Sequence, residues 1–107
     1  MTKPKVIAID VDGHLTLDVC WGAEECEKAR VNEKVKECVN ELYKKHFIII
    51  YTARRDDLIL PTIKWLRKNE INFHAFSNNK IPADYYCDDR MIDIKKLYLK
   101  QKKDGTI

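Results

Sequence analysis

The chain has 107 residues, of which 45% are hydrophobic, so it is long enough for one globular domain with a single core. No apolar run approaches the roughly 20 residues that a membrane-spanning helix needs, so a membrane protein is not expected. The net charge is +3, but residues 95–104 alone carry +4. The rest of the chain therefore lacks the basic excess that is typical of nucleic-acid binding.

The N-terminus predicts a cytoplasmic protein, because residues 1–4 lead straight into a strand and show no signal-peptide pattern. The four cysteines contain no C-x-x-C pair. In a protein that is not secreted, they are expected to be free thiols in a reducing compartment. These residues are Cys20, Cys26, Cys38 and Cys87.

The first predicted strand is the run Val6–Ile9, which is apolar without alternation and so indicates burial on both faces of a parallel sheet. It ends in two carboxylates one residue apart, Asp10 and Asp12, followed by Gly13, which lets the backbone turn away. Ligands bind at the carboxyl ends of strands in open α/β sheets. Two carboxylates so close repel each other unless a cation or a shared proton relieves them. We therefore expect chemistry at this strand end.

The next segment is expected to form a small flap or hairpin from residues 15–17 and 19–21, followed by a helical turn or two over residues 23–29. Apolar residues at helical spacing then predict a helix from Asn32 to Lys45, with Asn32 as its N-cap. Trp21 in the flap is expected either to form an apolar wall of the site or to cover the local core.

The second half of the chain alternates between strands and a helix. Strands are predicted over residues 47–51, 71–76 and 84–87, and a helix from about Asp57 or Leu60 to Asn69. Leu97 and Tyr98 favour a short helix in a basic C-terminal tail of about residues 95–107. The order predicts an α/β fold, a Rossmann-like sheet with right-handed crossovers, in a single domain that spans residues 1–107.

Polar residues follow the other strands as well. Thr52 follows the second strand, and Asp88 and Asp89 follow the last, with Lys80 in the polar loop before it. The four motifs Asp10-Val11-Asp12-Gly13, Thr52, Lys80 and Asp88-Asp89 occur in the same order, and at the same strand ends, as those of the haloacid dehalogenase (HAD) superfamily. The chain resembles this family of aspartate-nucleophile phosphohydrolases from Val6 to about residue 93.

The resemblance implies a three-layer, HAD-like fold with a mostly parallel sheet and no cap domain, since too few residues lie between the motifs for one. It implies Asp10 as the nucleophile and Asp12 as the general acid and base. It further implies phosphate binding by Thr52 and Lys80, and Mg²⁺ held by Asp10, Asp12, Asp88 and Asp89. Carboxylate oxygens suit Mg²⁺, and hydroxyl and ammonium groups suit phosphate.

One motif residue departs from the family pattern, because His14 stands where the family usually has threonine. This substitution puts full activity in question and makes His14 a candidate substrate contact or a neutral loop residue. Three arginines just past strand ends are further candidate substrate contacts, with surface ion pairs as the alternative. They are Arg54, Arg55 and Arg90.

The sequence therefore predicts a Mg²⁺-dependent hydrolase, a HAD-type phosphatase acting on a small phosphorylated metabolite such as a sugar phosphate or nucleotide. The alternatives are a phosphatase for nucleic-acid ends and a non-catalytic, phosphate-binding domain. Nucleic acid is the less expected partner. A homo-oligomer is also expected, because an uncapped site needs cover and the flap and tail offer the apolar residues Leu17 and Leu99.

Overall fold

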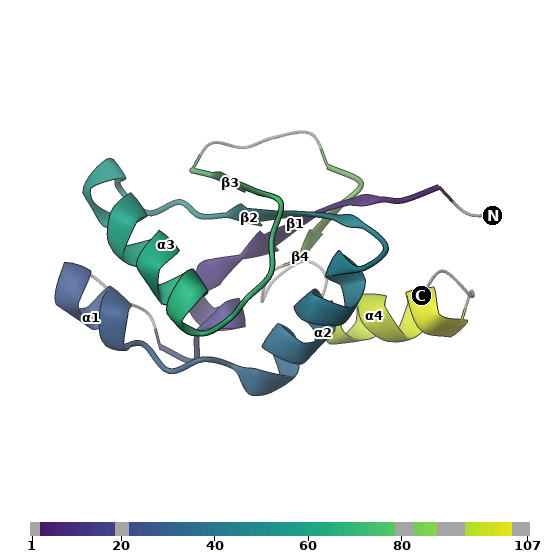
Figure 1. Ribbon diagram of the computed structural model, residues 1–107, viewed down its shortest axis with the longest axis horizontal. Helices are drawn as coiled ribbons and strands as arrows, with labels where there is room; N and C mark the ends of the chain where they lie inside the picture. The colour runs from purple at the N-terminus through teal and green to yellow at the C-terminus, as the bar shows by residue number, and fades with distance from the viewer. Residues whose placement is uncertain (1–2, 19–21, 79–82, 88–93, 104–107) are drawn as a thin grey trace.

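The computed structural model describes residues 3–18, 22–78, 83–87 and 94–103. Ten elements follow one another along these segments, and Figure 1 shows how they are arranged. They are β1 (Val6–Asp10), η1 (Val11–Leu15), α1 (Ala23–Lys28), α2 (Glu33–Tyr43), β2 (Phe47–Tyr51), η2 (Asp56–Leu58), α3 (Ile59–Lys68), β3 (Ala75–Ser77), β4 (Tyr85–Cys87) and α4 (Ile94–Lys103).

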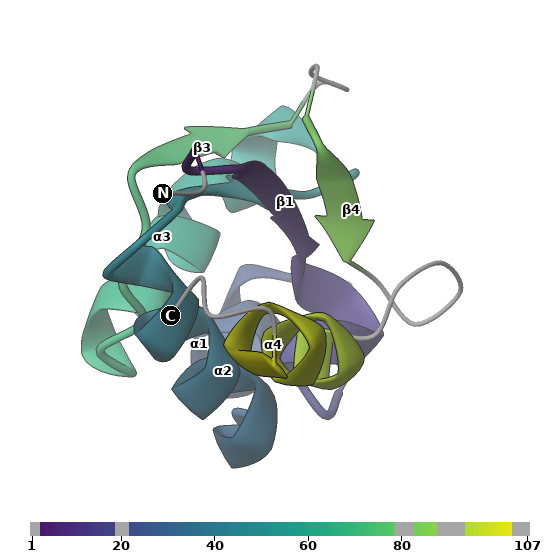
Figure 2. The same ribbon diagram turned by 90° about the vertical axis from the view of Figure 1, so that its right-hand side faces the viewer.

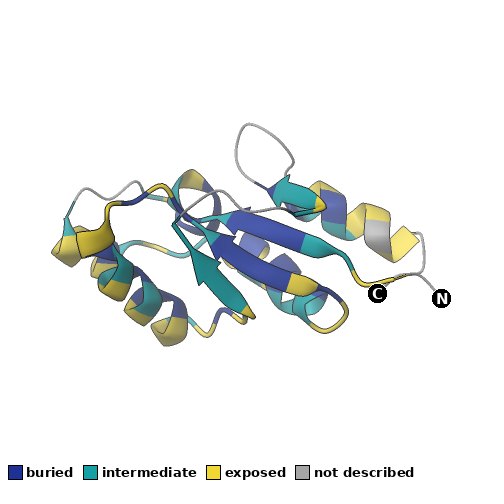
Figure 3. Ribbon diagram, turned by 90° about the horizontal axis from the view of Figure 1, so that it is seen from above, coloured by how far each residue is buried: buried dark blue, intermediate teal, exposed yellow. Residues whose placement is uncertain are grey.

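The sheet is four-stranded, with the order β3-β2-β1-β4, and all three strand pairs are parallel. This arrangement confirms the predicted Rossmann-like α/β fold. β1 and β2 are the central strands, and Figure 3 shows both as buried along most of their length. Burial on both faces explains why their sequences are continuous apolar runs instead of alternating ones.

The core lies between the sheet and the helices, which gather on one side of it in Figures 1 and 2. Ile7, Ile9, Ile48 and Ile50 face this side and are completely buried, together with Leu66 of α3. Each such side chain contributes about 1.5–3 kcal/mol through its removal from water. The packing of α1 on α3 and of α2 on α4 completes this layer.

Helix α2 begins as the sequence predicts, because the Asn32 side chain accepts a hydrogen bond from the Val35 amide at 3.3 Å. Its buried face consists of Val35, Cys38, Val39 and Leu42, at helical spacing. The helix ends at Tyr43, two residues before the predicted end.

The third strand is shorter than predicted and begins at Ala75 instead of Ile71. The reason lies at the end of α3, where Glu70 has a positive φ of 56° and the Ile71 amide donates to the Leu66 carbonyl at 3.0 Å. Such a left-handed residue followed by a buried apolar one closes a helix. Ile71 is therefore buried as part of the helix end and not as part of a strand.

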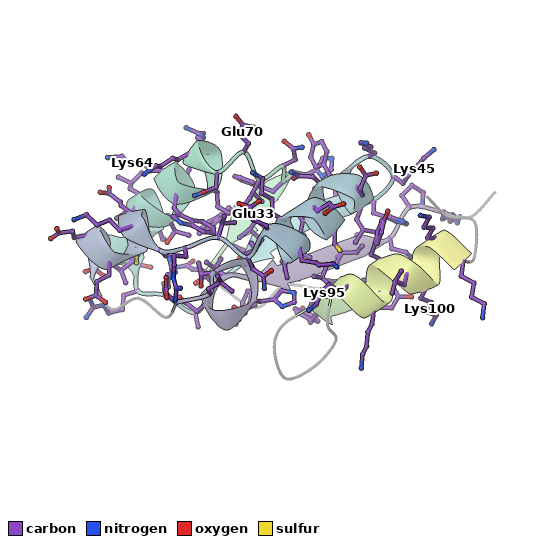
Figure 4. The ribbon with its side chains drawn as sticks, turned by 90° about the horizontal axis from the view of Figure 1, so that it is seen from below. Glu33, Lys45, Lys64, Glu70, Lys95 and Lys100 are labelled. Atoms are coloured by element: carbon purple, nitrogen blue, oxygen red, sulfur yellow. The ribbon has the colours of Figure 1, made fainter. Side chains whose placement is uncertain are left out.

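The basic tail contains a helix, as Leu97 and Tyr98 predict. It forms α4, whose Ile94 and Leu97 are buried in the core and which packs along α2. Figure 4 shows Lys95 and Lys100 along this helix, with Glu33 and Lys45 near the two ends of α2. Leu99, which is 64% exposed, lies among the lysines. The tail therefore belongs to the domain.

A hydrogen bond to one buried histidine connects the two chain segments that lead into β1 and β2. The Nδ1 atom of His46 accepts a hydrogen bond from the Lys5 amide at 2.9 Å, and the side chain is buried. Burial, with a smaller contribution from the charge of Lys5, lowers the pKa of His46 below its ordinary value of 6.5. The neutral imidazole is therefore the form that the folded protein favours.

We expect the free energy of unfolding to fall as the pH drops through about 6.5, because the unfolded chain then binds a proton that folded His46 resists. Chemical denaturation between about pH 5 and 8 would measure this slope. His46→Asn keeps an acceptor near the Nδ1 position but does not titrate, so its slope should be smaller. Equal slopes in both proteins would show that His46 does not couple to folding.

Candidate active site

The carboxyl ends of three adjacent strands bring the predicted site residues to one edge of the sheet. Asp10 is the last residue of β1 and is paired in register with Tyr51, the last residue of β2. Thr52 follows at once, is completely buried, and donates its amide proton to the carbonyl of Ser77, the last residue of β3, at 3.1 Å. The parallel register therefore places Asp10 and Thr52 on neighbouring strand ends, as the sequence indicated.

The chain turns sharply after Asp10 and forms η1, a kinked helical turn. Gly13 has a φ of 74°, which only glycine adopts without strain, and its amide donates to the Thr16 hydroxyl at 3.2 Å. Asp12, just before it, has extended rather than helical backbone angles. The turn thus fixes the backbone that carries the second carboxylate.

The Asp12 carboxylate is held by Arg54 in a two-pronged ion pair. Arg54 Nη2 donates to Asp12 Oδ1 at 2.6 Å, and Nε donates to Oδ2 at 2.9 Å. The third nitrogen, Nη1, donates to the Thr62 hydroxyl of α3 at 2.7 Å. The Arg54 side chain is 4% exposed, whereas that of Asp12 is 26% exposed, so solvent reaches the carboxylate but not the guanidinium.

The sequence did not identify Thr62 as a site residue. It lies on the buried, otherwise apolar face of α3, and its hydroxyl also donates to the Leu58 carbonyl at 2.6 Å. A buried polar group needs a partner, so a threonine on an apolar helix face was the available signal. The identity of that partner depended on the fold.

The other arginine beside this edge behaves differently. Arg55 is exposed and forms a 3.2 Å ion pair with Asp57, which is the surface pairing considered as an alternative. His14 is buried, with 5% of its surface exposed. Contacts of these two residues with a substrate remain predictions.

The flap is closed at its base by the two chain segments that enter and leave it. Thr16 forms an antiparallel bridge with Val31, and the Leu17 amide donates to the Arg30 carbonyl at 2.9 Å. The flap base therefore pairs residues 15–17 with residues 30–32. The predicted pairing of residues 15–17 with residues 19–21 falls on residues outside the described ranges.

An exposed ion pair reinforces this base. The Arg30 guanidinium and its amide both donate to the Asp18 carboxylate, with Nη2 to Oδ1 at 2.7 Å. These hydrogen bonds lower the pKa of Asp18 from its ordinary 3.8 to about 2. The pair therefore keeps its charges throughout the neutral and mildly acidic range. The ion pair thus holds together the two chain segments on either side of α1.

Several predicted site residues lie outside the described residues, namely Trp21, Lys80, Asp88, Asp89 and Arg90. The described segments lead directly to them. Asn78 donates to the Asp56 carboxylate at 2.6 Å, two positions before Lys80. Cys87 pairs with Ile9 in β1, one position before Asp88. Within the described ranges, no three His, Cys, Asp or Glu side chains form a group that could hold a metal.

The cysteines correct one expectation. Cys26 of α1, which is buried against Leu58 of η2, is disulfide-bonded, so the prediction of four free thiols is wrong. Cys38 and Cys87 are free and buried. Because disulfides persist in oxidising surroundings, this bond does not favour a reducing compartment. None of the helices in the described segments is both long and apolar enough to cross a membrane.

No protein-family model matches the chain, and no curated protein matches it either. Among solved structures, a conserved protein from Bacteroides thetaiotaomicron is similar, with a TM-score of 0.72 and 21% identity over 98% of this chain and 94% of that one. A structure of the Pnkp1/Rnl/Hen1 RNA repair complex and a second structure of a Pnkp1/Rnl/Hen1 complex are also similar. Their TM-scores are 0.61 and 0.60 at 22% and 21% identity, and the match covers 32% and 36% of those chains. At this identity, the likeness shows the fold.

Proposed function

We propose that the protein is a Mg²⁺-dependent phosphomonoester hydrolase of the HAD type, which works through an aspartyl-phosphate on Asp10. The observation that carries this proposal is the geometry of the strand ends. Asp10 and Thr52 lie on adjacent strand ends, and Asp12 is held beside them by Arg54. One segment would supply the nucleophile and the proton carrier, and the end of β2 would supply a hydroxyl for phosphate binding.

The chemistry follows from these groups. An Asp10 oxygen attacks phosphorus, and the bond from phosphorus to the leaving oxygen breaks as Asp12 donates a proton to that oxygen. Asp12 then takes a proton from water, which attacks the aspartyl-phosphate and releases inorganic phosphate. The Thr52 hydroxyl and Lys80 hold the phosphoryl oxygens during both steps.

The residues present fit Mg²⁺. Asp10 offers a carboxylate at the end of β1, and the chain continues from the adjacent strand β4 into Asp88 and Asp89, so the donors are the hard oxygens that Mg²⁺ prefers. These residues, with the Asp12 backbone carbonyl, would hold the ion. When bound, the ion would offset the repulsion between the anionic nucleophile and the anionic phosphate.

The proposed substrate is a small phosphorylated metabolite, such as a sugar phosphate or a nucleotide. With Mg²⁺ present, we expect the protein to release inorganic phosphate from 4-nitrophenyl phosphate. The same assay on a panel of phosphorylated metabolites would then rank the substrates. A protein that binds phosphate esters but releases no phosphate would instead support the non-catalytic alternative. The predicted homo-oligomer stays a prediction, although Leu17 is 55% exposed as a subunit contact would require.

A phosphatase for nucleic-acid ends is the second candidate, and α4 favours it. Five lysines lie on this helix, and one of the similar structures is of an RNA repair complex. Single-stranded RNA or DNA should then compete with 4-nitrophenyl phosphate, and the competition should weaken steeply with salt. A lack of competition at low salt would leave the metabolite phosphatase as the function.

A further inference from the structure

The guanidinium of Arg54 is buried, and each of its three nitrogens has a protein partner. Two of them bind the two oxygens of Asp12, and the third binds Thr62. Taking a guanidinium out of water is costly unless such partners compensate. Because its charge is already paired with Asp12 and each nitrogen already donates to the protein, we infer that this guanidinium does not serve as a substrate-binding group.

The same residue is fixed through its backbone. The Arg54 amide donates to the Thr52 hydroxyl at 3.1 Å, and Thr62, which receives Nη1, is itself anchored to the Leu58 carbonyl. Arg54 therefore links the end of β2 and the start of α3 to the turn that carries Asp12. A shift of any of these segments would be transmitted to the Asp12 carboxylate.

Each oxygen of a carboxyl group has two lone pairs, one of which carries the proton when Asp12 acts as an acid. Arg54 donates to one lone pair on each oxygen and so fixes the rotation of the carboxylate plane, and 26% of the Asp12 side chain remains exposed. Because Asp12 can otherwise rotate about two side-chain bonds, a fixed plane matters for proton transfer, which requires hydrogen-bond contact with the leaving oxygen. Misplacement of a reacting group by about 1 Å can cost a hundredfold in rate.

We propose that Arg54 is a positioning residue: with Thr62 it holds the Asp12 carboxylate in the orientation that delivers a proton to the leaving group. The assignment rests on the proposed phosphatase function. It replaces the expectation that Arg54 contacts the substrate, and it makes the contribution of Arg54 depend on how much the leaving group needs a proton.

The test compares kcat/KM for 4-nitrophenyl phosphate, whose leaving group departs without help, with that for phenyl phosphate, whose more basic leaving group needs a proton. This ratio reports the step in which the leaving group departs. Arg54→Lys keeps the charge but cannot form the fork, and Arg54→Ala removes both. We expect Arg54→Ala to lose about tenfold to a hundredfold more on phenyl phosphate than on 4-nitrophenyl phosphate, and Arg54→Lys to lose less.

Variants of Thr62 test the same idea without touching the ion pair. Thr62→Val removes the acceptor for Nη1 and should show a smaller loss with the same preference for the good leaving group, whereas Thr62→Ser should restore it. Arg67→Ala, an exposed arginine on α3, is the control and should change neither substrate. Thermal unfolding of each variant separates lost positioning from lost folding, and Arg54→Lys and Thr62→Val carry the test if Arg54→Ala does not fold.

A double-mutant comparison identifies Asp12 as the residue through which Arg54 acts. In the Asp12→Asn background, loss of Arg54 should lower kcat/KM by less than about twofold, because the group that it positions is gone. The positioning role would be overturned if the Arg54 variants lost equally on both substrates, changed only KM, or gained activity. It would also be overturned if loss of Arg54 cost as much in the Asp12→Asn background as in the unmodified protein. If the unmodified protein releases no phosphate from either substrate, the proposed function fails, and this inference fails with it.

Discussion

Asp10→Asn is expected to lower turnover by at least about a thousandfold while the domain remains folded. The substitution keeps the size of the side chain but replaces an anionic oxygen nucleophile with a neutral amide, which does not form a stable bond to phosphorus. Asp10 is half-buried at the end of β1, where its backbone pairs with Tyr51, and this pairing does not require the carboxylate. The fold should therefore tolerate the change.

The measurement is phosphate release from 4-nitrophenyl phosphate, with thermal unfolding as the check on the fold. Asp57→Asn makes the same chemical change at an exposed carboxylate paired with Arg55 and serves as the matched control. Rapid-quench mass spectrometry should detect a phosphorylated peptide containing residue 10 in the unmodified protein only. Full activity of Asp10→Asn would exclude covalent catalysis by this residue.

Removal of divalent ions is expected to reduce turnover about a hundredfold or more, and Mg²⁺ should restore it. The reason is charge, because Asp10 and the substrate phosphate are both anionic and approach each other closely only when a cation lies between them. Ca²⁺ should restore activity poorly, since its larger and more flexible coordination shell positions the two oxygens less well.

The assay follows phosphate release after treatment with excess EDTA and back-titration with each ion. Thermal unfolding with and without Mg²⁺ provides a second readout, since an ion bound only by the folded state raises the midpoint. Asp88→Asn should lose this midpoint shift, whereas Asp57→Asn should keep it. Undiminished turnover in excess EDTA would rule out the metal-dependent mechanism.

The sequence by itself determined those helices and strands whose position along the chain depends on local backbone geometry and on the pattern of burial. The apolar run ending in Asp10 predicted β1, residues 47–51 predicted β2 with the observed bounds, and Asn32 predicted the start of α2. Periodicity reports which faces are buried, and capping reports where a helix begins. The strand ends that carry Asp10 and Thr52 were therefore predictable, because the position of each depends on its own strand.

The tertiary structure decided what depended on contacts between distant segments. Arg54 lies 42 residues from Asp12, and its sequence context is equally compatible with a surface ion pair such as the one that Arg55 forms. Ile71 looks like a strand residue but closes α3, since the end of a helix competes with a strand for the same apolar side chain. The docking of α4 on α2 likewise required the fold, because composition and spacing do not specify which distant partner a side chain meets.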